Sequence, residues 1–290
     1  MKVTAVVVTY NRLELLKENI AALQKQTYSD LKVLVVDNCS ADGTKEYLEN
    51  LKGDCMETLY LNENLGGAGG FYYGMKKAYE NGADAVWIMD DDTIPNPDSL
   101  EQLVSAYDEI QSSGCECGYL ASDVRWIDGS ECIMNRVHFI SGECLNYKKI
   151  STATFVSLLI PRDTIAKVGL PIKEYFIWGD DKEYTLRISD ALPCFFVPSS
   201  TVLHKMKSNV GSNICTDELD RIGRYFYAFR NDYATAKKRG LRELLVYYMG
   251  FYLNFCRVIF KSKNGKRERL NIMQSGKKAG KHFLPQIERV

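Results

Sequence analysis

Short runs of β-branched and apolar residues alternate with longer amphipathic stretches through residue 121. The strand-like runs are residues 3–8, 31–36, 58–61 and 85–89, and the helix-like stretches that follow them are residues 12–26, 42–51, 70–80 and 97–111. Apolar residues in the longer stretches recur at the spacing of one helix face. This alternation predicts an α/β fold with parallel strands and helices on both faces of the sheet. Ligands of such sheets lie beyond the carboxyl ends of the strands.

The alternation becomes irregular after residue 121. Asp128-Gly129 is typical of a hairpin turn, and residues 154–160 have the pattern of a buried strand that ends at Pro161. The other expected elements are a helix over 180–189, strands over 194–197 and 201–204, and helices from 217 almost to the end. The sequence contains no internal repeat and no flexible linker.

The composition is that of a globular protein of enzyme size, because 46% of the 290 residues are hydrophobic and 26% are charged. These values exclude a disordered tail or a fibre. The nine cysteines are an odd number without a Cys-x-x-Cys pair, which favours reduced thiols in a cytosolic compartment. Cys115, Cys117 and Cys132 make a poor zinc set, since their one-residue gap is wrong for a zinc knuckle. We expect neither a signal peptide nor a membrane-spanning helix.

A formal net charge of zero conceals a strong asymmetry. Residues 1–236 hold 23 Lys and Arg against 34 Asp and Glu, whereas residues 237–290 hold 14 against 3. Within the basic part, residues 244–260 are almost wholly apolar and aromatic. A helix of this kind suits the interface of an anionic bilayer, and it equally suits a core helix or a dimer contact. The acidic body disfavours nucleic acid as a partner.

Each strand of the first half ends in a polar cluster. The clusters are Thr9-Tyr10-Asn11-Arg12, Asp37-Asn38, Asn62-Glu63-Asn64 and Asp90-Asp91-Asp92. Any one of them could be a turn or a helix cap, and a cap is a good alternative for Asp37. Because the carboxyl ends of parallel strands meet at one edge, we expect the four clusters to lie side by side.

The acidic triplet predicts a metal site. Three adjacent carboxylates at a strand end repel one another unless a cation is present. Alternation along an extended backbone should direct Asp90 and Asp92 to one side and Asp91 to the other. Hard divalent cations such as Mg²⁺ or Mn²⁺ prefer carboxylate oxygens and share them with substrate phosphates. A solvated acidic turn is the alternative.

A glycine run follows Asn64, with glycines at 66, 67, 69 and 70. It does not match the dinucleotide fingerprint, so a nicotinamide enzyme is not expected. Glycines just before a helix allow close approach of a phosphorylated ligand, whose charge the helix N-terminus would favour. A plain flexible turn is the alternative.

A second acidic group, Trp178-Gly179-Asp180-Asp181, begins a helix in the second half. Its carboxylates could serve the helix dipole, or one of them could be a general base. His204 ends a predicted strand and is a candidate third metal ligand, although a lone histidine is more often a buried polar residue. His138 and His282 are expected to be structural or surface groups.

Taken together, residues 6–12, 35–44, 64–71 and 90–92 resemble the motifs of inverting glycosyltransferases of family 2. The resemblance covers about the first 205 residues. It implies the GT-A nucleotide-sugar transferase fold, with a mixed, mostly parallel central sheet flanked by helices and a helical C-terminal appendage. A catalytic domain over 1–215 would comprise a nucleotide-binding half (1–121) and an acceptor-binding half (122–215). Residues 216–290 would form the basic helical region, a membrane-interface or dimer contact.

The resemblance also implies roles for individual residues. Those matching the donor-binding positions are Thr9, Tyr10, Arg12, Asp37, Asn64, Gly66, Gly67, Asp90 and Asp91. Those matching the Mn²⁺ or Mg²⁺ ligands are Asp90, Asp92 and His204. Asp181 corresponds to the carboxylate that activates the acceptor, with Trp178 and Asp180 beside it in the acceptor site. Inversion would follow from a single displacement at the anomeric carbon.

Within the family, the motifs are most similar to bacterial galactofuranosyltransferases that use UDP-galactofuranose. Rhamnosyltransferases that use dTDP-rhamnose share much of the pattern. The acceptor would be a glycan or a lipid-linked glycan of cell-surface polysaccharide, and the enzyme would be cytoplasmic, on the inner face of the membrane, with a homo-oligomer as an option. Gly179, inserted after Trp178, departs from the galactofuranosyl pattern. A haloacid-dehalogenase-type phosphohydrolase and a non-catalytic nucleotide-sugar-binding protein are the alternatives from other classes.

Overall fold

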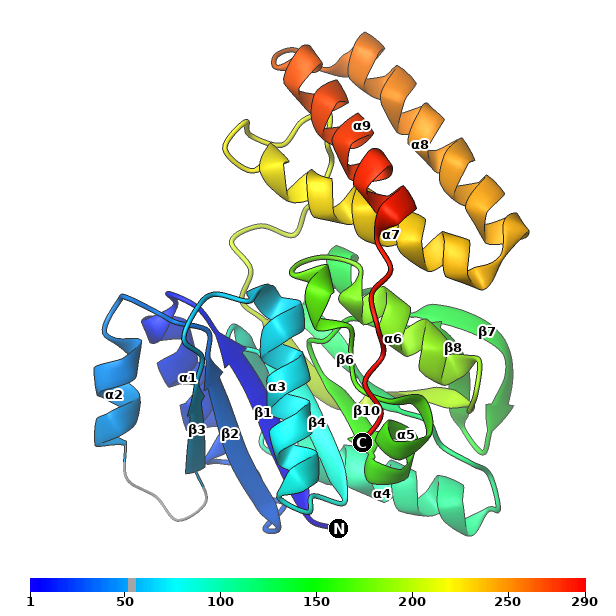
Figure 1. The fold of residues 1–290 in the computed structure, drawn as a ribbon. Helices are drawn as coiled ribbons and strands as arrows, with labels where there is room; N and C mark the ends of the chain where they lie inside the picture. The colour runs from blue at the N-terminus through cyan, green and yellow to red at the C-terminus, as the bar shows by residue number, and fades with distance from the viewer. Residues whose placement is uncertain (52–55) are drawn as a thin grey trace.

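The computed structural model describes residues 1–51 and 56–290. Within these residues ten strands form one sheet, in the order β3-β2-β1-β4-β9-β6-β10-β8-β7, and β5 pairs with β10 off this path. The strands are β1 (Val3–Thr9), β2 (Leu31–Asp37), β3 (Met56–Tyr60), β4 (Ala85–Asp90), β5 (Thr93–Pro95), β6 (Leu120–Trp126), β7 (His138–Cys144), β8 (Tyr147–Thr152), β9 (Leu158–Pro161) and β10 (Cys194–His204). Figure 1 shows the sheet with helices packed around it.

The first four strands are parallel, as the alternating pattern predicts. Thr9 of β1 is in register with Asp37 of β2, and Val8 is in register with Asp90 of β4. The polar residues that end these strands therefore meet at one edge of the sheet. The second half adds antiparallel pairs, including β4 with β9 and β5 with β10, so the sheet is mixed.

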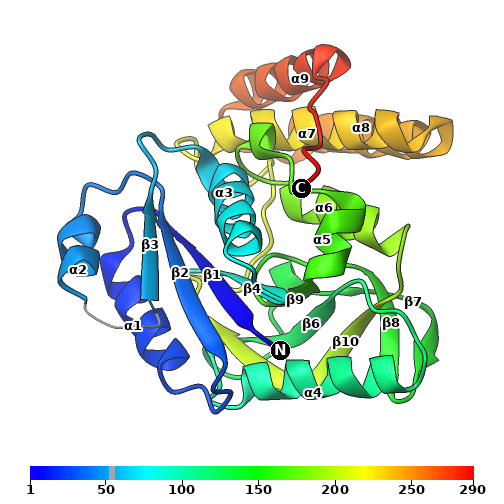
Figure 2. The same cartoon turned by 60° about the horizontal axis from the view of Figure 1, so that its bottom comes forward.

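Helices cover both faces of the sheet. Alternate residues of β1 point to opposite faces, and all of them are buried. Val3, Ala5 and Val7 pack with α1 (Leu13–Leu23), α2 (Thr44–Asn50) and α4 (Ser99–Ser112). Val6 and Val8 pack with α3 (Gly66–Glu80), α5 (Arg162–Val168) and α6 (Asp180–Ser189). Figure 2 shows α3 and α4 on opposite sides of the sheet.

Strand β5 and helix α5 were not predicted, and three predicted elements differ from the structure. Helix α3 begins at Gly66 and not at residue 70, because the glycines form the first helical turn. Strand β9 begins at Leu158, four residues later than expected. The two strands expected over 194–204 are one strand, β10, with an irregular register between Val197 and Thr201. Pro198 lies in this irregularity, where the missing N–H of a proline is tolerated.

The C-terminal part is a three-helix layer of α7 (Tyr225–Arg239), α8 (Leu241–Lys261) and α9 (Lys266–His282). These helices pack on one another, and Figure 1 shows them above α6. Asn231 of α7 donates to the carbonyl oxygens of Tyr175 and Trp178, which attaches the layer to the loop before α6. Across residues 1–51 and 56–290, no helix is both long and apolar enough to cross a bilayer.

The cysteines do not form disulfides in the described part of the chain. Eight of them are free thiols, and Cys55 lies outside the described residues.

Candidate active site

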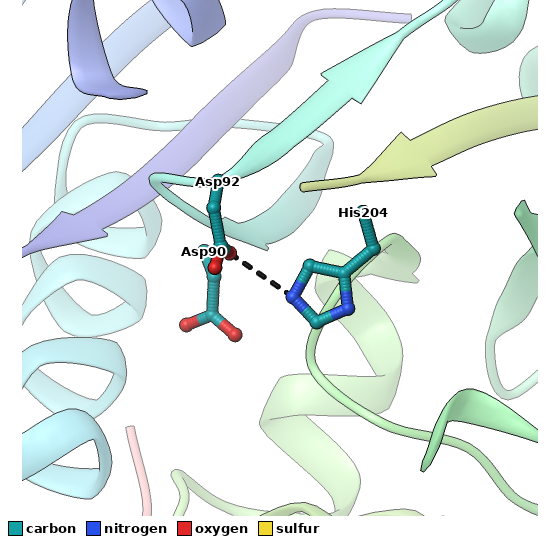
Figure 3. A group of neighbouring side chains, drawn as sticks. All are labelled: Asp90, Asp92 and His204. Carbon is teal, nitrogen blue, oxygen red and sulfur yellow. Dashed lines mark hydrogen bonds and ion pairs between the residues drawn. The ribbon is translucent and has the colours of Figure 1, made fainter. Parts of the chain in front are cut away.

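Asp90, Asp92 and His204 form a cluster at the carboxyl edge of the sheet (Figure 3). Each offers one ligand atom, and the three atoms lie within 4.8 Å of one another. Asp90 ends β4, Asp92 follows it in a turn, and His204 ends β10. Antiparallel pairing of β5 with β10 places His204 opposite Thr93, directly after Asp92. Strand pairing therefore unites ligands that are far apart in the sequence.

Hydrogen bonds fix the ring of His204. Its Nε2 lies 3.0 Å from Oδ1 of Asp92, and its Nδ1 lies 2.8 Å from Oδ1 of Asn135. The amide nitrogen of Asn135 donates to Oγ1 of Thr154, which leaves the amide oxygen to accept a hydrogen bond from the N–H at Nδ1. Nε2 is then the nitrogen that faces the carboxylates. No sequence signal pointed to Asn135, because it lies in a short 3₁₀ helix (Ile133–Asn135) without a motif.

Burial and neighbouring charges shift the pKa values of the cluster. Burial and then the charge of Asp92 raise the pKa of Asp90 to about 7. Burial raises the pKa of Asp91 to about 6, against the opposing charge of Arg12. Burial lowers the pKa of His204, but its hydrogen bond with Asp92 outweighs this and raises the value to about 10. Neighbouring carboxylates thus oppose one another's ionisation, a repulsion that a divalent cation would relieve.

Thr9 and Arg12 contact the acidic triplet directly. Oγ1 of Thr9 donates to Asp91 over 2.8 Å, and Nη1 of Arg12 lies 3.2 Å from Asp91 and 2.7 Å from Asp92. Asp91 and Asp92 therefore both contact the guanidinium of Arg12, although strand alternation predicted that these two side chains would point apart. The prediction was wrong on this point because β4 ends at Asp90 and the next two residues lie in a turn.

The other candidate residues for binding the donor lie at the same edge of the sheet. Asp37 is buried and accepts a hydrogen bond from the backbone N–H of Ser40. Next to it, the buried Asn38 donates to Oδ1 of Asn64 and to the carbonyl oxygen of Gly66. Sequence reasoning did not assign a role to Asn38, although its position after Asp37 at a strand end was a usable signal. Tyr10 is exposed.

The two glycines at the start of α3 are in different surroundings. Gly66 has φ +71°, and a Cβ there would overlap the carbonyl oxygen of Phe176. The neighbouring Ala68 donates its N–H to the same oxygen over 3.1 Å. A Cβ at Gly67 would meet nothing within 4 Å. Gly66 is therefore needed for packing against the loop before α6, whereas Gly67 leaves open space.

The loop before α6 has a constrained backbone. Phe176 and Trp178 both have φ +64°, and Gly179 has φ +86°. Residues other than glycine rarely adopt these backbone angles unless the surrounding structure holds the backbone in place, as Asn231 does here. Gly179, the inserted residue, takes the last of these positions at little cost.

Asp180 and Asp181 have different surroundings. Asp180 is buried, and burial raises its pKa well above the ordinary value, with smaller contributions from the charges of Asp181 and Asp90. The charge of Asp90 therefore acts on Asp180. Asp181 instead lines a pocket of about 410 Å³. Burial raises the pKa of Asp181 as well, against a hydrogen bond from the N–H of Lys182.

The pocket draws on distant parts of the chain. Its lining residues are Met134, Trp178, Gly179, Asp181, Lys182, Gly211, Ser212, Tyr225, Ala228 and Asp232. Trp178 and Tyr225 meet edge to face with ring centroids 4.9 Å apart, and Lys182 pairs with Asp232 over 3.0 Å. Only Trp178 and Asp181 among them were predicted as site residues. Tyr225, Ala228 and Asp232 could not be found from the sequence because they lie on α7, which reaches the pocket only through tertiary packing.

Several glycosyltransferases are similar in sequence to this chain over much of its length. The galactofuranosyltransferase GlfT1 of Mycolicibacterium smegmatis is 30% identical over 264 residues, which cover 84% of this chain and 85% of that protein. GlfT1 of Mycobacterium tuberculosis is 29% identical over 273 residues, covering 84% of each. The glycosyltransferase AglE of Haloferax volcanii is 28% identical over 195 residues, covering 65% of this chain and 62% of AglE.

Solved structures show the same fold. Residues 1–349 of Staphylococcus aureus TarS, in complex with UDP, superpose with a TM-score of 0.56 at 15% identity, covering 94% of this chain and 70% of that one. The sheet of this chain thus has the GT-A arrangement. Residues 4–165, more than half of the chain, match the family described as Glycosyl transferase family 2. This chain is therefore a glycosyltransferase that belongs to family 2.

Proposed function

We propose that this enzyme transfers galactofuranose from UDP-galactofuranose to a glycan or a lipid-linked glycan of cell-surface polysaccharide, with a divalent metal and with inversion. The observation that carries the proposal is the cluster of Asp90, Asp92 and His204 within 4.8 Å, at the edge that also holds Thr9 and Arg12. The names of the GlfT1 relatives support the sugar, and the UDP complex of TarS supports the nucleotide.

The ligand set fits Mn²⁺ or Mg²⁺. Two carboxylate oxygens and one imidazole nitrogen suit a divalent cation, and the nitrogen favours Mn²⁺, since Mg²⁺ takes mostly oxygen ligands. Asp90, Asp92 and His204 would hold the ion. A cation bound there would offset negative charge on the diphosphate leaving group.

The donor would lie along the edge of the sheet. In this proposal Thr9, Tyr10, Arg12 and Asp37 bind the nucleoside, and Asn64, Gly66 and Gly67 form the loop over the diphosphate, with Asp91 near the sugar. The open space at Gly67, which lies in the first turn of α3, suits an anionic group at the helix N-terminus.

The acceptor would enter the pocket beside Trp178. Its hydroxyl oxygen attacks the anomeric carbon while the bond from that carbon to the diphosphate oxygen breaks, and Asp181 takes the hydroxyl proton. UDP leaves with the bonding electrons, and attack from the opposite side inverts the configuration. An aromatic ring beside carboxylates is suited to a sugar, since it offers an apolar face and hydrogen-bond acceptors. Asp180 would bind the acceptor from the side of the metal cluster.

In the proposed division of the chain, residues 1–215 carry out transfer, and residues 216–290 complete the acceptor side. The enzyme would act in the cytoplasm, at the inner face of the membrane. Membership of family 2 argues against the phosphohydrolase alternative.

Thermal-shift measurements with UDP, GDP and dTDP, each with and without Mn²⁺, test the donor and the metal together. We expect UDP with Mn²⁺ to stabilise the enzyme most, and Asp92→Ala to abolish the contribution of Mn²⁺. A larger response to dTDP would replace galactofuranose by rhamnose. Binding of UDP-galactofuranose without any transfer to a glycan would contradict a catalytic role. NMR of the product tests the inverted configuration.

A further inference from the structure

One side of α8 is apolar and is exposed within residues 1–51 and 56–290. Its residues share one helical face and are 51% to 80% exposed: Leu241, Leu245, Val246, Met249, Leu253 and Phe260. The opposite side, with Phe251 and Val258, is buried against α7 and α9. Figure 1 shows α8 at the outer side of the three-helix layer, away from the sheet. We call these six residues the α8 face. An exposed apolar surface of this length marks a docking site.

Basic residues flank the α8 face at both ends. Lys237 and Arg242 lie at its start, and Lys261, Lys263 and Arg267 lie at its end, all of them exposed. Acidic residues are scarce here, with 3 against 14 basic residues in 237–290. The surface is therefore a strip of apolar side chains between two clusters of positive charge.

This charge pattern indicates which kind of partner binds the α8 face. A second copy of the chain would place basic ends against basic ends, whether the two α8 helices ran parallel or antiparallel. Anionic headgroups would instead pair with both ends while acyl chains receive the apolar side chains. We propose that the α8 face docks flat on the surface of an anionic lipid bilayer, with the helix lying in the interface.

Helix α7 connects this surface to the proposed acceptor pocket. Tyr225 and Asp232 of α7 line the pocket, and Phe229 of the same helix meets Phe251 of α8 with ring centroids 5.6 Å apart. One helix thus separates the pocket from the docked surface. The inference rests on the proposed function in one respect, since a lipid-linked acceptor would be presented at this same surface.

Flotation of the full chain with vesicles tests the proposal. One set of vesicles is pure phosphatidylcholine, and the other contains about a third phosphatidylglycerol. We expect binding to the anionic vesicles only, weakened by salt. Leu245→Glu with Met249→Glu should reduce the partition coefficient at least tenfold. Lys263→Gln with Arg267→Gln should reduce it about 25-fold, at about fivefold for each basic residue. Ile127→Glu, at an exposed apolar residue elsewhere, should leave it unchanged.

Three results would overturn the proposal. The first is no flotation of the parent chain, and the second is equal flotation with both kinds of vesicle. The third is a dimer in analytical ultracentrifugation that Leu245→Glu with Met249→Glu dissociates, which would assign the α8 face to a second copy. The response to UDP and Mn²⁺, measured without lipid, should be the same in these variants. Failure of the proposed function would appear in that response and not in flotation.

Discussion

Nε2 of His204 lies 3.0 Å from Oδ1 of Asp92, although 112 positions separate the two residues. Their meeting depends on β5, a strand of three residues that follows the acidic triplet and pairs antiparallel with the end of β10. The cluster of Asp90, Asp92 and His204 is therefore a product of sheet topology. Side chains that hold His204 from behind should matter nearly as much as the ligands themselves.

Asn135→Ala should weaken Mn²⁺ binding about 10- to 100-fold, because Nδ1 of His204 loses the acceptor that orients the ring. Calorimetry with Mn²⁺ in the presence of UDP measures this. Asn50→Ala, at an exposed asparagine on α2, is the control and should bind as the parent does. Equal affinities in all three proteins would remove Asn135 from the support of the site.

Asp181→Asn should lower turnover about 10²- to 10⁴-fold and leave UDP binding nearly unchanged, because an amide cannot accept the proton. Steady-state kinetics with UDP-galactofuranose and a short acceptor measure this. Asp180→Asn is the matched variant, since Asp180 is the neighbouring carboxylate and the charge of Asp90 raises its pKa. We expect it to alter the KM for the acceptor more than turnover. Loss of turnover in Asp180→Asn alone would exchange the two roles.

Gly66→Ala should destabilise the fold by about 2 kcal/mol or more, because the new Cβ overlaps the carbonyl oxygen of Phe176 and alanine disfavours a φ of +71°. Gly67→Ala is a stringent control, since its Cβ would meet no atom within 4 Å. Urea unfolding compares the two. If both variants unfolded at the same urea concentration, the packing role of Gly66 would be refuted.

Glu288→Gln should lower stability only slightly at pH 7, because the ion pair with Lys76 at 2.7 Å is exposed to solvent screening. Hydrogen bonds from Lys76 and then Tyr72 lower the pKa of Glu288. The stabilisation is therefore present above the ordinary carboxyl pKa of about 4.3 and disappears as the pH falls through the lowered value. Melting temperatures of parent and variant should converge in acid. A difference that persisted there would assign the effect to something other than this charge.

Local pattern was enough for the parallel half of the fold. The buried run of β1 and the amphipathic stretch that forms α1 leave little choice of element, and parallel strands bring their polar ends to one edge. For this reason Thr9, Asp37 and Asp90 can be assigned to a single site from sequence pattern alone. The start of α3 was predicted wrongly, because glycine is a weak helix former and packing against Phe176 decides where the helix begins.

The sequence by itself determined the family, the sheet edge and the residue types that make up the candidate metal site there, because these depend on periodicity and on motifs within a few residues. Tertiary structure alone decided that Asn135 holds His204, that Arg12 is shared by Asp91 and Asp92, and that α7 lines the pocket beside Asp181. Such contacts join segments that are distant along the chain, and their energies depend on how whole elements pack. The local pattern of hydrophobic and polar residues does not predict that packing.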